Sequence, residues 1–307
     1  LKNGSRVNLF APKDMKKDYL GIMGYGALMG ILRNYEVINP FINSSIDAFN
    51  RLKPGFEAPV CIVTSLGHSV EEPSRNRSIL VGLVRDMANP LATRFEVRSP
   101  SPLSNTYLVI ASLYQVMLDG IQAAVASRKT NKELEREISK GYGEESFYLD
   151  QYREYRSEEN VFEYFTEEER NKRFGIPPAT PWENVKNLKK YAHRVEILHR
   201  GDVITQDIVD SVVASTIDRW TNELASRVIY DDMDIIRECR KLHTPETSTD
   251  LDDLRWEEIQ RLKWELVKSS TTKTSLLESI RIALQNKDYD QASNLQLTLN
   301  QKMQELR

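Results

Sequence analysis

The chain has 307 residues, enough for one large domain or two domains of ordinary size. Its formal net charge of -3 argues against nucleic acid or an anionic membrane surface as the main partner. The two cysteines, Cys61 and Cys239, provide neither a zinc cluster nor a disulfide framework, so the composition favours a reducing, cytoplasmic location.

The first predicted element is a helix over residues 19–35, in which apolar side chains recur at helical intervals. The most apolar part, residues 20–32, is too short to cross a bilayer, and no signal peptide is recognisable. We therefore expect no membrane partner.

A proline-rich turn and two buried strands follow. Residues 50–59 contain Pro54, Gly55 and Pro59 and present Arg51 and Glu57. Apolar runs predict strands at residues 60–63 and 79–84. Between these strands, residues 74–78 present Arg75 and Arg77.

Residues 94–98 predict a strand that pairs with residues 79–84. Side chains alternate along a strand, so Arg94, Glu96 and Arg98 share one face. A charged row is costly to bury unless charged groups face it. One interpretation is a surface strand with a ladder of ion pairs, and the other is a face that binds a charged ligand.

A helix is predicted from about residue 105 to residue 121, with Ser104 as a candidate cap. We expect its apolar stripe to pack in the core. The stripe comprises Tyr107, Ile110, Ala111, Tyr114, Met117, Leu118 and Ile121.

Residues 130–173 are highly charged and rich in tyrosine, which predicts solvated helices with tyrosines at contacts. Residues 175–181 form a predicted loop. Further helices are expected over residues 208–235, after a linker at 244–250, and as a pair over 276–306. The last pair weakly resembles a UVR-type hairpin, but an antiparallel helix pair at an oligomer interface is the favoured interpretation.

The motifs N-R-L-K-P-G-F-E-A-P (50–59), S-R-N-R-S (74–78), R-F-E-V-R-S-P-S-P (94–102), N-T-Y-L (105–108) and L-D-G-I (118–121) stand in order over about seventy residues. In this order and spacing they closely resemble the C-terminal half of the glutamine synthetase catalytic domain. The resemblance implies an α+β fold with a curved antiparallel sheet and helices over residues 1–191, followed by an all-α extension over residues 192–307.

Residues 3–10 resemble a family stretch that follows a metal-binding histidine, so we expect the chain to be the C-terminal portion of a longer enzyme. That portion alone is expected to be inactive. The resemblance also implies a cytoplasmic homo-oligomer that binds no nucleic acid and no membrane, with active sites shared between subunits.

The resemblance also implies a role for each matching side chain. Arg51 and Arg98 would hold glutamate, and Glu57 would close over the site and bind and deprotonate ammonium. Arg77 would meet the transferred phosphate, Arg94 would contact ATP, and Glu96 would bind Mg2+ or Mn2+. The implied reaction makes glutamine from glutamate, ammonia and ATP through γ-glutamyl phosphate, as part of nitrogen metabolism.

The chain departs from the family pattern where the family contacts ATP. Gly82 stands where an arginine is usual, Leu91 stands where a lysine is common, and Arg85 is a poor candidate to substitute. Two alternatives therefore stay open. One is a related γ-glutamyl-amine ligase that differs around Glu57, and the other is a non-catalytic homologue with a structural or regulatory role in assembly.

Overall fold

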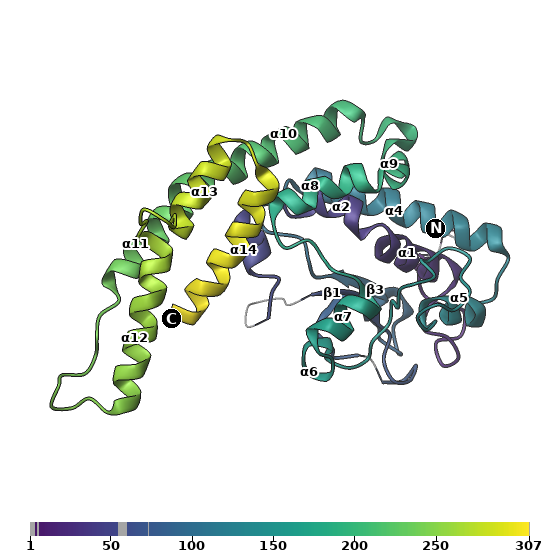
Figure 1. Cartoon of the computed structure of the whole chain (residues 1–307). Coiled ribbons are helices and arrows are strands. Elements are labelled where there is room, and N and C mark those ends of the chain that lie inside the picture. Colours follow the sequence, from purple (N-terminus) through teal and green to yellow (C-terminus); the bar gives the residue numbers. More distant parts are fainter. Residues whose placement is uncertain (1–3, 5, 55–59, 73, 307) are drawn as a thin grey trace. The chain divides into compact units, whose positions relative to one another are not determined.

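The computed structural model describes residues 4, 6–54, 60–72 and 74–306, and Glu57 lies outside this set. The chain forms two compact units (Figure 1). The first contains Leu1–Pro178 and Asn184–Val213, and the second contains Ala179–Glu183 and Ala214–Arg307. Residues 192–213 thus pack with the first unit, whereas the predicted boundary at residue 191 follows the family resemblance and stays a prediction.

The first unit is built around a close contact between helix α1 (Ile22–Arg33) and helix α4 (Thr106–Ser127). A Cβ atom on Gly30 would lie 2.0 Å from the carbonyl oxygen of Val116, and one on Gly120 would lie 2.1 Å from that of Gly26. Only glycine permits this approach of two backbones. The glycine of the L-D-G-I motif is therefore a packing residue.

A three-stranded sheet lies in the same unit, with the order β1 (Cys61–Ser65), β2 (Ile79–Val84), β3 (Arg94–Val97). The predicted antiparallel pairing of β2 with β3 is confirmed, with Gly82 directly opposite Glu96. Strand β1 pairs with β2 in parallel, so the described sheet is mixed rather than wholly antiparallel. The overall class, α+β with a helical extension, is as predicted.

Helix α4 corrects one prediction, because much of the expected core stripe faces solvent. Tyr107, Ile110, Tyr114 and Leu118 are exposed, and the buried side comprises Ser112, Val116, Gly120 and Ala124. Apolar residues occur on several sides of this helix, so periodicity alone could not select the packed side. The contact with α1 selects the side with the small residues.

The start of α4 corrects a second prediction. Asn105 caps the helix by accepting a hydrogen bond from the backbone of Tyr107, whereas the Ser104 hydroxyl donates to the carbonyl of Ile42 at 2.5 Å. By length and composition α4 could also span a membrane. A helix inside a water-soluble domain passes the same test, so this one segment is weak evidence.

The charged, tyrosine-rich part of the first unit, residues 130–173, is less exposed to solvent than its composition predicts. Tyr148 and Tyr155 are buried, whereas Tyr142, Tyr152 and Tyr164 are exposed. The other helices are α2 (Tyr35–Ile42), α3 (Ile46–Asn50), α5 (Asn131–Ile138), α6 (Val161–Tyr164), α7 (Glu167–Phe174) and α9 (Ala192–His199). Short turns at Pro90–Ala92 and Arg200–Asp202 complete the set.

The second unit is helical, as predicted. Helices α8 (Pro181–Lys190) and α10 (Gln206–Glu223) each have residues in both units. A π-helical turn (Leu224–Val228) joins α10 to α11 (Ile229–Glu238), so the predicted helix over 208–235 is one segment with an irregular turn. Helix α12 (Asp250–Val267) follows, and α13 (Leu276–Gln285) packs on α14 (Tyr289–Leu306) as the predicted pair.

Candidate functional site

The charged row of β3 is largely open to solvent. Arg94 is exposed and donates to the carbonyl of Ala92 at 3.2 Å. The side chain of Glu96 is 66% exposed, whereas that of Arg98 is 11% exposed. The Nε atom of Arg98 lies 3.9 Å from a carboxylate oxygen of Glu96, and this is the one ion pair of the row within the described residues. A ladder of ion pairs is therefore absent from the part of β3 that the structure describes.

Arg51 reaches the end of this row from helix α3. Its Nη1 atom donates to the carbonyls of Ser99 at 3.1 Å and Pro100 at 3.4 Å. These bonds hold the chain that leaves β3 against the residue that ends α3. Arg51 therefore lies next to Arg98 in space, although nearly fifty residues separate them.

Arg77 approaches the same place from the segment before β2. It is exposed, and its guanidinium makes no hydrogen bond or ion pair to another described residue, whereas Ser78 beside it is buried. The backbone N–H of Arg98 donates to the carbonyl of Leu80 at 3.0 Å, so the residues before β2 run beside those after β3.

The electrostatics of Arg98 show which charges are near it. Burial is the main cause that lowers the pKa of Arg98; Glu96 opposes this effect, and the positive charges of Arg77 and Arg51 add to it. Arg51 and Arg77 thus lie near Arg98, and Arg98 in turn pairs with Glu96. Arg94 lies at the opposite end of β3, and Glu57 falls outside the described residues.

The two departures from the family pattern, Gly82 and Leu91, have clear structural settings. Gly82 is directly opposite Glu96, and a Cβ there would meet nothing closer than 3.6 Å, so the position has room for a side chain. Arg85 cannot take its place, because its guanidinium donates to the carbonyls of Met15, Asp18 and Val70 at 2.7–3.0 Å.

Leu91 lines a hollow of about 570 Å³ near the start of β3. The other lining residues are Arg6, Val7, Asn8, Leu9, Phe10 and Tyr114. The Asn8 side chain donates to the carbonyl of Thr93 at 2.6 Å, and Phe10 stacks on Phe95. This hollow lies beside the strand that carries Arg94.

The described side chains provide few of the ligands that a metal site needs. Magnesium and manganese prefer several oxygen ligands. In the described part of the chain, no group of three or more histidine, cysteine, aspartate or glutamate side chains could hold a metal. Glu96 could supply one ligand, but the described residues by themselves do not fit a bound metal.

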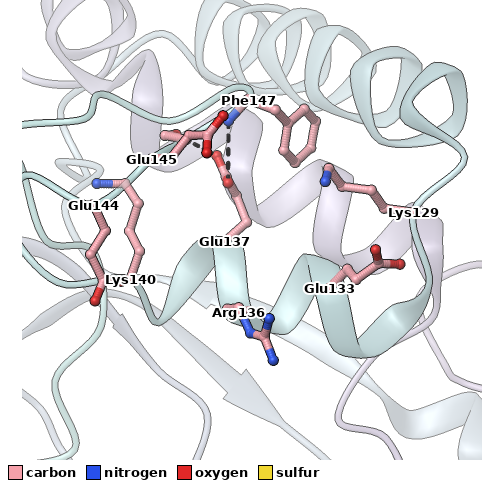
Figure 2. Close-up of a pocket in the computed structure, with 9 residues that line it drawn as sticks. Lys129, Glu133, Arg136, Glu137, Lys140, Glu144, Glu145 and Phe147 are labelled. Atoms are coloured by element: carbon pink, nitrogen blue, oxygen red, sulfur yellow. Dashed lines mark hydrogen bonds between the residues drawn. The ribbon is translucent and has the colours of Figure 1, made fainter.

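A second pocket, of about 400 Å³, lies between α5 and residues 144–147. Figure 2 shows Glu137 in its floor, where its carboxylate accepts a hydrogen bond from the backbone of Phe147. The same carboxylate accepts from the backbones of Tyr148 and Leu149, so Glu137 is fully engaged in holding this loop. None of the predicted site residues lines this pocket.

Comparison with known proteins bears on the whole region that carries the arginine cluster. The family model described as "Glutamine synthetase, catalytic domain" matches residues 1–148. Residues 1–148 are therefore similar to the glutamine synthetase catalytic domain. This region contains every predicted site residue.

Curated relatives agree with the family match. The glutamine synthetase of Methylococcus capsulatus is 38% identical over 128 residues, which are 39% of this chain and 25% of that protein. That of Pseudomonas aeruginosa is 36% identical over 128 residues, and that of Aquifex aeolicus is 37% identical over 123 residues. The match covers about a quarter of the length of these glutamine synthetases.

Sequence reasoning missed the residues that support the cluster. Asn76, between Arg75 and Arg77, binds the backbone of residues 157 and 159, which lie outside the glutamine synthetase-family match. Glu36, Asp150, Arg153 and Arg194 form a buried charge network across the same unit. Their spacing in the sequence gives no signal, because each partner lies far from the next along the chain.

Proposed function

We propose that this chain contributes the anion-binding part of an ATP-dependent glutamate–ammonia ligase. The observation that carries the proposal is the gathering of Arg51 and Arg77 near Arg98, which pairs with the carboxylate of Glu96. Guanidinium groups match carboxylate and phosphate oxygens with two hydrogen bonds at once. An excess of them over carboxylates suits a site that handles glutamate and phosphate together.

The reaction needs such a site because a carboxylate is a poor electrophile. ATP would phosphorylate the side chain of glutamate to γ-glutamyl phosphate, and ammonia would then displace phosphate to give glutamine. Both steps gather negative charge, which fixed positive groups stabilise. Arg98 and Arg51 would bind the carboxylates of glutamate, and Arg77 and Arg94 would bind the phosphates.

Two roles have less support from the described residues. Glu57 would bind and deprotonate ammonium, but nothing in the structure describes its surroundings. Glu96 would offer one oxygen ligand to Mg2+ or Mn2+, and the described residues supply no companion ligands. We therefore attribute no step of the reaction to a metal held by this chain alone.

Further parts of the proposal concern the protein as a whole. The chain by itself would form no glutamine, and a cytoplasmic homo-oligomer with shared active sites would be the active form. Residues 1–191 would be the catalytic portion, and residues 192–307 would be the extension. Measured glutamine formation by the purified chain would contradict the first statement.

The binding test compares two neighbouring arginines. Arg75 and Arg77 are both exposed and lie two residues apart, but only Arg77 influences Arg98. We expect Arg77→Gln to weaken binding of inorganic phosphate about tenfold or more, since charge-assisted hydrogen bonds contribute roughly 1.5–3 kcal/mol. Arg75→Gln is the matched control and should leave the affinity unchanged. Titration calorimetry at low ionic strength would measure both, and equal effects would contradict the assignment.

A second candidate function is supported by Gly82. Gly82, opposite Glu96, stands where the family usually has an arginine, so the proposed phosphate site lacks one positive group. This loss favours a non-catalytic homologue that retains glutamate binding. The two candidates differ in a simple measurement. The ligase requires glutamate-dependent release of phosphate from ATP by the complete protein, and the non-catalytic homologue would show none.

The γ-glutamyl-amine ligase depends on the surroundings of Glu57, and a comparison of ammonia with polyamines as substrates would test it.

A further inference from the structure

The segment that presents Arg77 is held by a distant part of the chain. The side-chain amide of Asn76 donates to the carbonyls of Ser157 at 3.2 Å and Glu159 at 2.7 Å. Its Oδ1 atom accepts from the backbone and the hydroxyl of Ser78, at 2.9 and 2.7 Å. Asn76 thus joins both sides of Arg77 to residues 157–159.

Ser78 provides a second link to the same segment. Its hydroxyl accepts a hydrogen bond from the backbone of Val161 at 3.0 Å, and its carbonyl accepts one from Cys61 in β1 at 2.9 Å. Because Ser78 is 2% exposed, water does not readily replace these bonds. The residue that follows Arg77 is therefore fixed between β1 and the start of α6.

Glu158 holds the other end of the Arg77 segment. Its carboxylate accepts from the Ser65 hydroxyl, which also contacts the hydroxyl of Ser74. It also accepts from the backbone of Gly67 at 2.8 Å and from Arg156 at 2.6 Å. Ser74 in turn accepts from the backbone of Asn76 at 3.1 Å, so the network closes around residues 74–78.

The segment 156–161 is itself anchored to the sheet. Residues Tyr155 and Ser157 exchange backbone hydrogen bonds with Thr64 of β1, at 2.8 and 3.0 Å, in a parallel bridge. The anchor therefore moves with the sheet that carries Glu96. Residues outside the family match thus fix the geometry of a motif inside it.

Electrostatic repulsion explains why the segment that carries Arg77 needs an anchor. Arg77 makes no hydrogen bond or ion pair to a described residue, and the like charge of Arg98 repels it. A long, exposed arginine on a loose segment would turn toward water, since nothing attractive holds it in place. A fixed backbone keeps the three charges together, and a bound tetrahedral oxyanion would relieve their repulsion.

We propose that Asn76, together with the segment 156–161, is a positioning element that holds the Arg77 guanidinium in place for a phosphate or phosphoryl group. The proposal rests on the proposed function, because it takes Arg77 to be an anion ligand. Asn76 acts through Arg77 and does not touch the anion.

The test is a double-mutant cycle on the full chain, with inorganic phosphate as the probe. We expect Asn76→Ala to weaken phosphate binding about five- to tenfold, because the hydrogen bonds that fix Arg77 are lost. In an Arg77→Gln background, Asn76→Ala should have no further effect on the affinity. A merely structural role would lower the affinity by the same factor in both backgrounds.

Each outcome decides one statement. If Asn76→Ala leaves the affinity unchanged while Arg77→Gln lowers it, the positioning role is wrong and the proposed function stands. If Arg77→Gln has no effect, or the unaltered chain does not bind phosphate, the proposed function and the positioning role both fall.

Circular dichroism and thermal unfolding would verify folding, and Ser78→Ala is a milder second variant if Asn76→Ala does not fold. It removes the bonds that the Ser78 hydroxyl makes with Asn76 and Val161 and keeps the backbone bond to Asn76. It should weaken binding in the same non-additive way, and additive weakening would overturn the proposal.

Discussion

Two arginine clusters in the first unit differ in how their charge is balanced. In the buried cluster, Arg153 contacts Glu36 at 2.5 Å and Arg194 contacts Asp150 at 2.7 Å, and the arginine side chains are 8–9% exposed. In the other cluster, Arg51 and Arg77 lie near Arg98, whose one ion pair among the described residues is with Glu96 at 3.9 Å. The first is a structural network with matched charges, and the second is the anion site of the proposed function. Counting arginines does not separate the two clusters, but their partners do.

The largest expected effect comes from breaking the buried pair. Arg153→Met would leave Glu36 buried without its closest cation, so we expect a loss of about 3–5 kcal/mol in the free energy of unfolding. Arg173→Met is the control, because Arg173 pairs with Glu154 at 2.8 Å and is 39% exposed. It should cost less than about 1 kcal/mol. Urea unfolding would measure both, and similar losses would remove the distinction between buried and exposed pairs.

Acid should weaken the buried network through Asp150. Burial opposes ionisation of this carboxyl, but Arg194 and the Tyr155 hydroxyl together hold its pKa below the usual value of 3.8. A carboxyl whose pKa is lower in the folded state contributes stability above its unfolded pKa, and this contribution is lost as the pH falls through the folded pKa. Thermal unfolding between about pH 7 and about pH 2 should therefore show a decline below about pH 4.

The variant Asp150→Asn identifies the source of that decline. It should be less stable than the unaltered chain near neutral pH and should lose less stability in acid. The exposed residue Asp202 provides the control, since Asp202→Asn should leave the pH profile unchanged. An unaltered acid profile in Asp150→Asn would contradict the assigned role.

Replacing an arginine by methionine should have a different outcome in the cluster of Arg51, Arg77 and Arg98. Arg98→Met removes a charge that Arg51 and Arg77 repel, and the Nη1 atom of Arg98 is buried without a hydrogen bond to any described residue. We expect the free energy of unfolding to change by less than about 1 kcal/mol, and in either direction. Glutamate binding, measured by equilibrium dialysis, should be lost. A destabilisation as large as that of Arg153→Met would show that Arg98 is structural.

The smallest effect on stability is expected at Gly82. Gly82→Arg would place a side chain opposite Glu96, where a Cβ makes only ordinary van der Waals contacts of 3.6 Å or more, so stability should change by no more than about 0.5 kcal/mol. Phosphate binding should strengthen several-fold, because an added guanidinium can form charge-assisted hydrogen bonds. Gly82→Ala is the control for the backbone and should leave binding unchanged. Weaker binding by Gly82→Arg would contradict the idea that this position faces the phosphate.

Much of the fold followed from local pattern. The strand at residues 79–84, its antiparallel partner and the helix pair near the C-terminus were predicted from apolar runs and alternation, because these signals arise between near neighbours. The packed side of α4 was predicted wrongly. Its apolar residues surround the helix, and the steric demand of Gly26, Gly30 and Gly120 selects the side that faces α1.

The candidate site divides in the same way. The sequence alone determined the resemblance to glutamine synthetases, the charged row of β3 and the identity of the arginines, because motif order and side-chain chemistry are properties of the sequence. Only the tertiary structure decided which charges are paired, that Gly82 faces Glu96, and that Asn76 ties Arg77 to residues 157–159. The physical reason is distance along the chain. These contacts join residues from about fourteen to more than eighty positions apart, and local preferences carry no information about which distant groups will meet.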